Sequence, residues 1–98
     1  MTAEQQIEKA PFDMDAVVDE ITRFVAEQTR TSPEVDQDLF ATGVANSMFA
    51  MQLVMFLEQA YFVTVAGPDL QLSNFSTVKS MATLVGRLQA EEAADSDV

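Results

Sequence analysis

The sequence predicts an all-α domain, and three observations support this class. Apolar residues recur at intervals of three and four residues in stretches near 14–29, 47–61 and 78–88, as they do in amphipathic helices. The strongest β propensity lies in residues 61–65, but no second strand pattern can pair with it, and a lone strand is unstable. The 98 residues are enough for one small domain.

Composition excludes several classes of function. Sixteen acidic residues against five basic ones give a net charge of −11, which repels nucleic acid and anionic lipid but attracts basic protein surfaces. The same acidity can equally serve solubility alone. The chain has no cysteine and no histidine, so disulfides, a zinc site and a Ser-His nucleophile pair are excluded. No apolar run reaches the ~18–20 residues of a membrane span, and no signal peptide is recognisable, so we expect a cytoplasmic protein.

The chain divides into a leader, one domain and a tail. Residues 1–12 are polar and broken by Pro11, and we expect a flexible leader. The domain spans 13–90 and begins with a helix over 14–29, whose first turns carry acids that the helix dipole favours. Residues 91–98 are acidic, and we expect them to be disordered.

Residues 30–46 form a long loop without a sustained period. Leu39 and Phe40 are apolar anchors that can hold this loop against the core, and loops of this length are usually functional or disordered. An EF-hand calcium loop starting at Asp36 would need glycine at its sixth position and glutamate at its twelfth. Those positions are Ala41 and Ser47, so a calcium loop is rejected.

The second helix is predicted to start at Ser47 and to end at Ala60 or Tyr61. Asn46 and Ser47 are both good N-cap residues, and an unbroken run of helix formers follows them. Ser47 should therefore be exposed at the end of a loop, beside free backbone N–H groups and the positive end of the helix dipole. That environment suits a phosphate ester on the serine hydroxyl.

The second helix is apolar on the side that should face water. On a helical wheel its core face comprises Ala50, Leu53, Val54, Leu57 and Tyr61. A small domain has little room for a helix that is apolar all round, so we interpret the other side as a partner-binding surface. Its candidate residues are Met48, Phe49, Met51, Gln52, Met55 and Phe56.

The remaining chain is predicted to complete the helical layout. Residues 61–65 become a helix end followed by an extended segment, and Gly67-Pro68 turns the chain. A short helix is expected at 69–72. Ser76 is expected to cap the last helix, where apolar residues keep helical spacing at Val78, Met81, Ala82, Val85 and Leu88.

Residues 38–58 also resemble the prosthetic-group site of acyl carrier proteins. In that family a loop ending in Gly-x-Asp-Ser-Leu opens the second helix, and here the stretch reads Gly43-Val44-Ala45-Asn46-Ser47-Met48. One residue is added, Asn replaces Asp, and Met replaces Leu. The layout over 14–90, with residues 74–78 before the last helix, supports the resemblance. It implies a small four-helix bundle with a long loop between helices I and II and a short helix III.

The resemblance implies that Ser47 carries 4′-phosphopantetheine from coenzyme A, with Asn46 and Gly43 in the neighbouring loop. The thiol of this group would hold an acyl intermediate as a thioester. The implied partners are a phosphopantetheinyl transferase and the enzymes that load, modify and accept the acyl group, and the chain itself would be a monomeric carrier and no enzyme. Residues 46–54 look most like discrete polyketide-pathway carriers of unusual extender units, of hydroxymalonyl or methoxymalonyl type, with a short polar cargo.

Two alternatives stay open. An aminoacyl or D-alanyl carrier would share the Ser47 chemistry but hold a different cargo. A helical adaptor without a prosthetic group would instead use its Met- and Phe-rich second helix to bind a partner helix. An enzyme in its own right lacks support, because no compact acid–base constellation is visible in the sequence.

Overall fold

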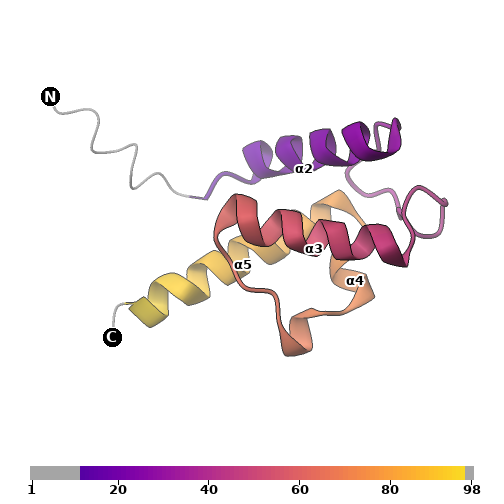
Figure 1. Ribbon diagram of the computed structural model, residues 1–98. Helices are drawn as coiled ribbons and strands as arrows, with labels where there is room; N and C mark the ends of the chain where they lie inside the picture. The colour runs from indigo at the N-terminus through magenta and orange to yellow at the C-terminus, as the bar shows by residue number, and fades with distance from the viewer. Residues whose placement is uncertain (1–11, 97–98) are drawn as a thin grey trace, which may run out of the picture.

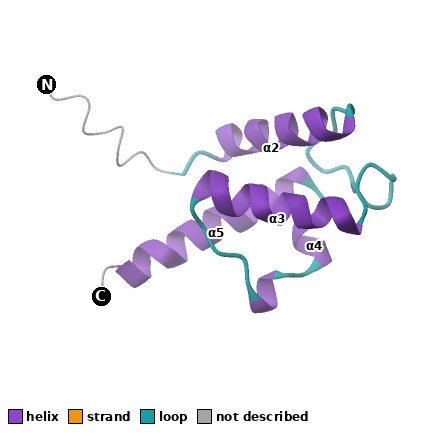
Figure 2. Ribbon diagram, in the orientation of Figure 1, coloured by secondary structure: helices purple, strands orange, loops and turns teal. Residues whose placement is uncertain are grey.

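The computed structural model describes residues 12–96, with side chains placed through Glu91. Within that range it contains four α-helices and one 3-10 turn: α2 (Met14–Thr29), α3 (Ser47–Tyr61), η1 (Gly67–Asp69), α4 (Leu72–Phe75) and α5 (Val78–Ser96). No strand occurs among these residues (Figure 2). The predicted all-α class is therefore confirmed, as are the bounds expected for the first two helices.

The helices form a small bundle in which α2 packs chiefly on α5 (Figure 1). α3 runs along the same bundle in front of α5, and α4 packs against α5 near its start. The loop from Arg30 to Asn46 closes one end of the bundle and delivers the chain to the start of α3. Ser47 consequently lies at that end of the molecule.

The core is built from one apolar stripe of each long helix. Val17, Ile21 and Val25 repeat every four residues on α2, and all three are buried. Leu53 and Leu57 on α3 are fully buried, as the helical wheel predicted. α5 is the central element because it buries the largest set: Val78, Met81, Ala82, Leu84, Val85 and Leu88.

The segment after α3 is extended but unpaired, as predicted. Val63 and Val65 point inward and are buried, which explains the apolar character of the stretch without a sheet. The carboxylate of Glu58 accepts a hydrogen bond from the Val65 N–H at 2.9 Å. Phe62 ends the helix in a left-handed conformation with φ of 57° and an exposed ring.

The short third helix lies later in the chain than predicted. In place of a helix at 69–72, Gly67–Asp69 form a 3-10 turn and the helix occupies Leu72–Phe75. Pro68 is the reason for the early turn, because its fixed φ suits the first positions of a helix. Phe75 is then the residue that anchors the short helix, since it is 3% exposed.

The expected cap of the last helix was also misplaced by one residue. Thr77, and not Ser76, accepts the Ser80 N–H at 2.9 Å through its hydroxyl, and the Ser80 hydroxyl accepts the Thr77 N–H at 3.2 Å. This reciprocal pair satisfies two helix-terminal donors in the manner of a capping box. The Ser76 hydroxyl donates back to the Ser73 carbonyl instead.

The two ends of the chain are described only in part. The predicted leader falls outside the described residues except for Phe12. The ring of Phe12 packs against Gly86, and a Cβ added at Gly86 would lie 2.9 Å from it. α5 continues to Ser96, past Glu91, where we expected disorder to begin. Glu and Ala favour the helix, and Arg87 pairs with Glu91 at 3.2 Å one turn later. The domain limits themselves stay predictions.

We expect Leu53→Ala to lower the free energy of unfolding by about 2–5 kcal/mol, because it opens a cavity at a fully buried site. Met55→Ala on the same helix is the control, since Met55 is 53% exposed and its loss should cost less than about 0.5 kcal/mol. Urea denaturation of both variants measures the difference. Equal losses would show that the two faces of α3 are assigned incorrectly.

Candidate functional site

The loop before α3 is fixed to the last helix by backbone hydrogen bonds. The Leu39 N–H donates to the Ser76 carbonyl at 2.7 Å, and the Lys79 N–H donates to the Val35 carbonyl at 2.9 Å. The Leu39 side chain is fully buried. The predicted role of Leu39 as an anchor is therefore confirmed, while Phe40 packs against the core only in part. This loop is a defined structure that ends at the candidate site.

A tight turn over residues 38–43 directs the chain toward Ser47. The Asp38 carboxylate accepts the N–H groups of Phe40 and Ala41 at 3.1 and 2.9 Å. Gly43 closes the turn with φ of 82°, a conformation that costs other residues about 1–2 kcal/mol. The Ala45 N–H then donates to the Leu39 carbonyl at 2.9 Å. The glycine at the start of the motif is thus needed for its backbone conformation.

Asn46 caps the second helix. Its side-chain Oδ1 accepts the Phe49 N–H at 2.9 Å, and its backbone carbonyl accepts the Ala50 N–H at 2.9 Å. The amide therefore makes the hydrogen bond that an aspartate would make at this position, but without a negative charge. The helix dipole beside Ser47 is consequently not neutralised by its own cap.

Ser47 is the first residue of α3, and it is exposed, as predicted. Within the described part of the chain its hydroxyl makes no hydrogen bond, and the backbone N–H groups of Ser47 and Met48 have no acceptor. An exposed hydroxyl next to two free N–H donors at a helix start has the geometry to carry a phosphate ester.

The outer face of α3 agrees with the prediction at four positions and differs at two. Met48, Met51 and Met55 are 78%, 61% and 53% exposed, and Gln52 is exposed as well. Phe49 was expected at the edge of this face, but it is buried in the core.

Phe56 was also expected on this face, but it is only partly exposed and packs against the core. Its ring stacks on Phe24 of α2 with centroids 4.2 Å apart, and the same Phe24 ring stacks on Phe49 at 6.0 Å. The helical wheel placed Phe49 and Phe56 correctly in angle. The error arose because α2 covers this side of α3.

A hollow between α3 and α4 continues the exposed face, and the sequence did not reveal it. Its volume is about 270 Å³, and Met51, Leu70 and Leu72 lie around its mouth. Leu70 and Leu72 are 54% and 61% exposed. In the sequence, the only indication of this hollow is the apolar character of Leu70 and Leu72, beside the predicted third helix.

The electrostatics of the site are set by the whole chain and little by α3 itself. Glu58 is the only acid of α3, and it is already bound to the Val65 N–H. At the far end of α3 the Tyr61 hydroxyl donates to Glu20 at 2.6 Å, and burial together with this bond and the carboxylate charge raises the pKa of Tyr61 above its usual value. In the described range no cluster of side chains is suited to hold a metal ion, and no helix has the length and apolarity to cross a membrane.

Comparison with known proteins supports a carrier-protein family. The chain is 28% identical over 61 residues to the D-alanyl carrier proteins of two strains of Lactobacillus delbrueckii subsp. bulgaricus. The matched region is 62% of this chain and 76% of each relative. No known family model matches the chain.

Asn46→Ala is expected to lower the free energy of unfolding by about 0.5–2 kcal/mol, because the Phe49 N–H loses its cap. Asn46→Asp is expected to keep that cap and to raise the free energy of unfolding by about 0.3–1 kcal/mol, because a negative charge at the helix start is favourable. Urea denaturation at low salt distinguishes them. The cap assignment fails if alanine is tolerated as well as aspartate.

Proposed function

We propose that this protein is a carrier whose Ser47 hydroxyl is the attachment site of 4′-phosphopantetheine. The observation that carries the proposal is the Asn46-capped start of α3, where an exposed serine has no competing hydrogen bond within the described structure. The similarity to D-alanyl carrier proteins supports the carrier class.

The residues around Ser47 fit a phosphodiester. The two free N–H groups of Ser47 and Met48 offer donors to its oxygens, and the uncharged Asn46 adds no repulsion. The Asp38 carboxylate accepts N–H groups of its own turn and makes no hydrogen bond to the serine hydroxyl.

The attachment reaction places few demands on this chain. The Ser47 oxygen bonds to the phosphorus next to the pantetheine of coenzyme A, 3′-phosphoadenosine 5′-phosphate leaves, and the serine proton passes to the transferase. The bound group then supplies a thiol that holds an acyl group as a thioester. The chain itself positions the hydroxyl and gives the tethered cargo a high effective concentration at each docked enzyme. It acts as a carrier and not as a catalyst.

The first candidate cargo is a short polar extender unit of a polyketide-type pathway. Its support is the resemblance of residues 46–54 to discrete carriers of hydroxymalonyl- or methoxymalonyl-type units.

The second candidate cargo is an amino acid, and the comparisons favour it. The relatives are named for a D-alanyl group. An aminoacyl thioester carries a positive ammonium group, which a chain with net charge −11 attracts, whereas a malonyl-type group carries a carboxylate that the chain repels.

Incubation with coenzyme A and a broad-specificity phosphopantetheinyl transferase should add the mass of one phosphopantetheinyl group. Ser47→Ala should abolish the addition, because the hydroxyl is the nucleophile. Ser73→Ala is the matched control, because Ser73 is an exposed serine in α4. The intact mass of each variant decides the matter. Labelling that persists in Ser47→Ala would refute the site, and an unmodified wild type would favour the adaptor function.

The cargo can be distinguished by loading the modified protein. If the second candidate holds, an adenylating enzyme with ATP and D-alanine should add an aminoacyl group, whereas a malonyl-type donor with its acyltransferase should add little. The reverse pattern supports the extender unit. Intact mass of the protein isolated from its natural host, measured before any thiol treatment, provides the independent check.

A further inference from the structure

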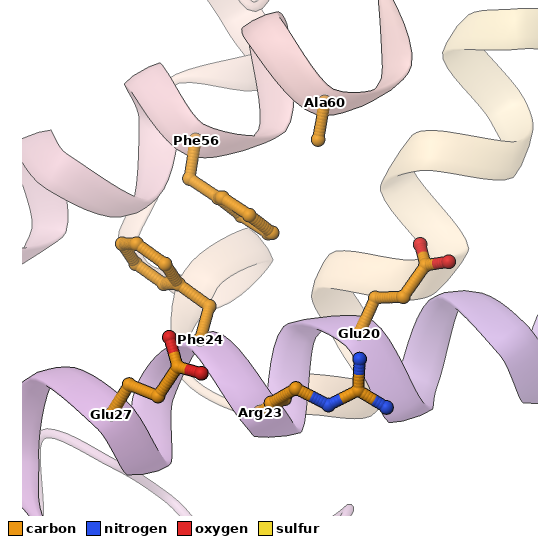
Figure 3. Close-up of a pocket in the computed structure, with 6 residues that line it drawn as sticks. All are labelled: Glu20, Arg23, Phe24, Glu27, Phe56 and Ala60. Carbon is orange, nitrogen blue, oxygen red and sulfur yellow. The ribbon is translucent and has the colours of Figure 1, made fainter.

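A groove runs between α2 and α3, and three aromatic rings form its floor. Phe24 of α2 stacks on Phe56 at 4.2 Å with the planes 12° apart, and on Phe49 at 6.0 Å with the planes 5° apart. Figure 3 shows the Phe24 and Phe56 rings turned toward one another between the two helices, with Glu20, Arg23 and Glu27 on the α2 side. Phe24 and Phe56 are only partly buried, so the groove presents aromatic surface.

The groove consists of three adjoining hollows on the α2 flank of α3, which share lining residues. Its three sections have volumes of about 490, 260 and 280 Å³ from the Ser47 end onward. Gln28 and Gln52 line both the first and the second section, and Phe24 and Phe56 line both the second and the third. Asn46 and Met48 line the first section, so the groove opens beside the proposed attachment site.

Bulky rings lie between the two helices beside the groove. The α2 backbone packs closely on α5 but not on α3. Phe24, Phe49 and Phe56 contribute stacked rings to the contact between α2 and α3, and the Tyr61 hydroxyl donates to Glu20 farther along the same contact. A groove held open by packed aromatic rings is available without any rearrangement of the fold.

The charge along the groove is negative on one rim. Glu20 and Glu27 lie on the α2 side, and Arg23 between them pairs with Asp19 at 3.4 Å. Glu20 already accepts the Tyr61 hydroxyl, whereas the Glu27 carboxylate has no hydrogen bond or ion pair in the described structure. The α3 side contributes uncharged Gln52, Met55 and Gln59. The hollow on the α4 side of α3 has no charged lining residue.

We propose that this groove is the docking site for an amphipathic helix of the enzyme that modifies Ser47. The occupant presents apolar side chains to the Phe24–Phe56 surface and a lysine or arginine to Glu27. The proposal rests on the proposed function, because the partner acts on Ser47. It places docking on the α2 flank of α3, where Met48 and Met55 also line the groove, whereas Met51 and the hollow beside Leu72 lie on the opposite flank.

The first test uses a broad-specificity phosphopantetheinyl transferase as the probe and compares two charge reversals. Glu27→Lys should lower kcat/KM for modification about tenfold or more and reduce its salt dependence, because the rim charge steers the basic helix. Asp36→Lys is the matched control: it makes the same charge change at an exposed loop position outside the groove lining, and it should alter kcat/KM by less than about threefold. Circular dichroism establishes that both variants keep the helical fold.

The second test locates the partner directly, and the absence of cysteine makes it specific. Gln28→Cys in the groove and Gln71→Cys beside the opposite hollow each receive a thiol-linked photo-crosslinker. The transferase should crosslink strongly from position 28 and weakly from position 71. Equal loss of kcat/KM in both charge variants, no loss in either, or preferential crosslinking from position 71 would overturn the proposal. If the transferase never modifies the wild type, the proposed function is refuted, and the docking proposal that rests on it is refuted as well.

Discussion

The buried side chain of Leu39 and the backbone hydrogen bonds around it hold the site in place. Leu39 is 0% exposed, its N–H is bonded to the Ser76 carbonyl, and its own carbonyl accepts the Ala45 N–H. One residue thereby joins the long loop, the turn between α4 and α5, and the approach to α3. Because Asn46 and Ser47 follow directly, the orientation of the serine depends on this anchor. A loop of this length would otherwise lose conformational entropy without enough compensating contacts.

The start of α3 combines a neutral cap with a strongly acidic chain. Asn46 satisfies the Phe49 N–H without adding a charge, so the positive end of the helix dipole stays available to a phosphodiester on Ser47. Fifteen of the sixteen acids lie outside α3, and the single acid of α3 is bound to the backbone at Val65. α3 therefore presents mostly apolar side chains near Ser47. Recognition there depends on shape and apolar contact, whereas the acids of α2 attract basic partners over longer distances.

The aromatic contact between α2 and α3 links packing to the proposed docking. Phe24, Phe49 and Phe56 join α2 to α3, whose backbones lie farther apart than those of α2 and α5. The same rings leave a groove with one acidic rim. The same three rings therefore stabilise the bundle and form part of the surface that we propose a partner recognises.

The sequence alone determined the helical class, the bounds of the first two helices and the position of Ser47 at a capped helix start, because these depend on local periodicity and on short-range hydrogen bonds. It also predicted the unpaired extended segment after α3, since no partner strand was present. Only the tertiary structure decided that Phe49 is buried and that Phe56 is partly covered, because this depends on where α2 lies relative to α3. The burial of Phe75 and the bond from the Leu39 N–H to the Ser76 carbonyl are likewise tertiary contacts, whereas the Thr77–Ser80 cap is local and stands one residue from the position that the sequence pattern favoured. Angular position on a helix follows from the sequence, whereas the neighbour that covers each angle is fixed only when the helices pack.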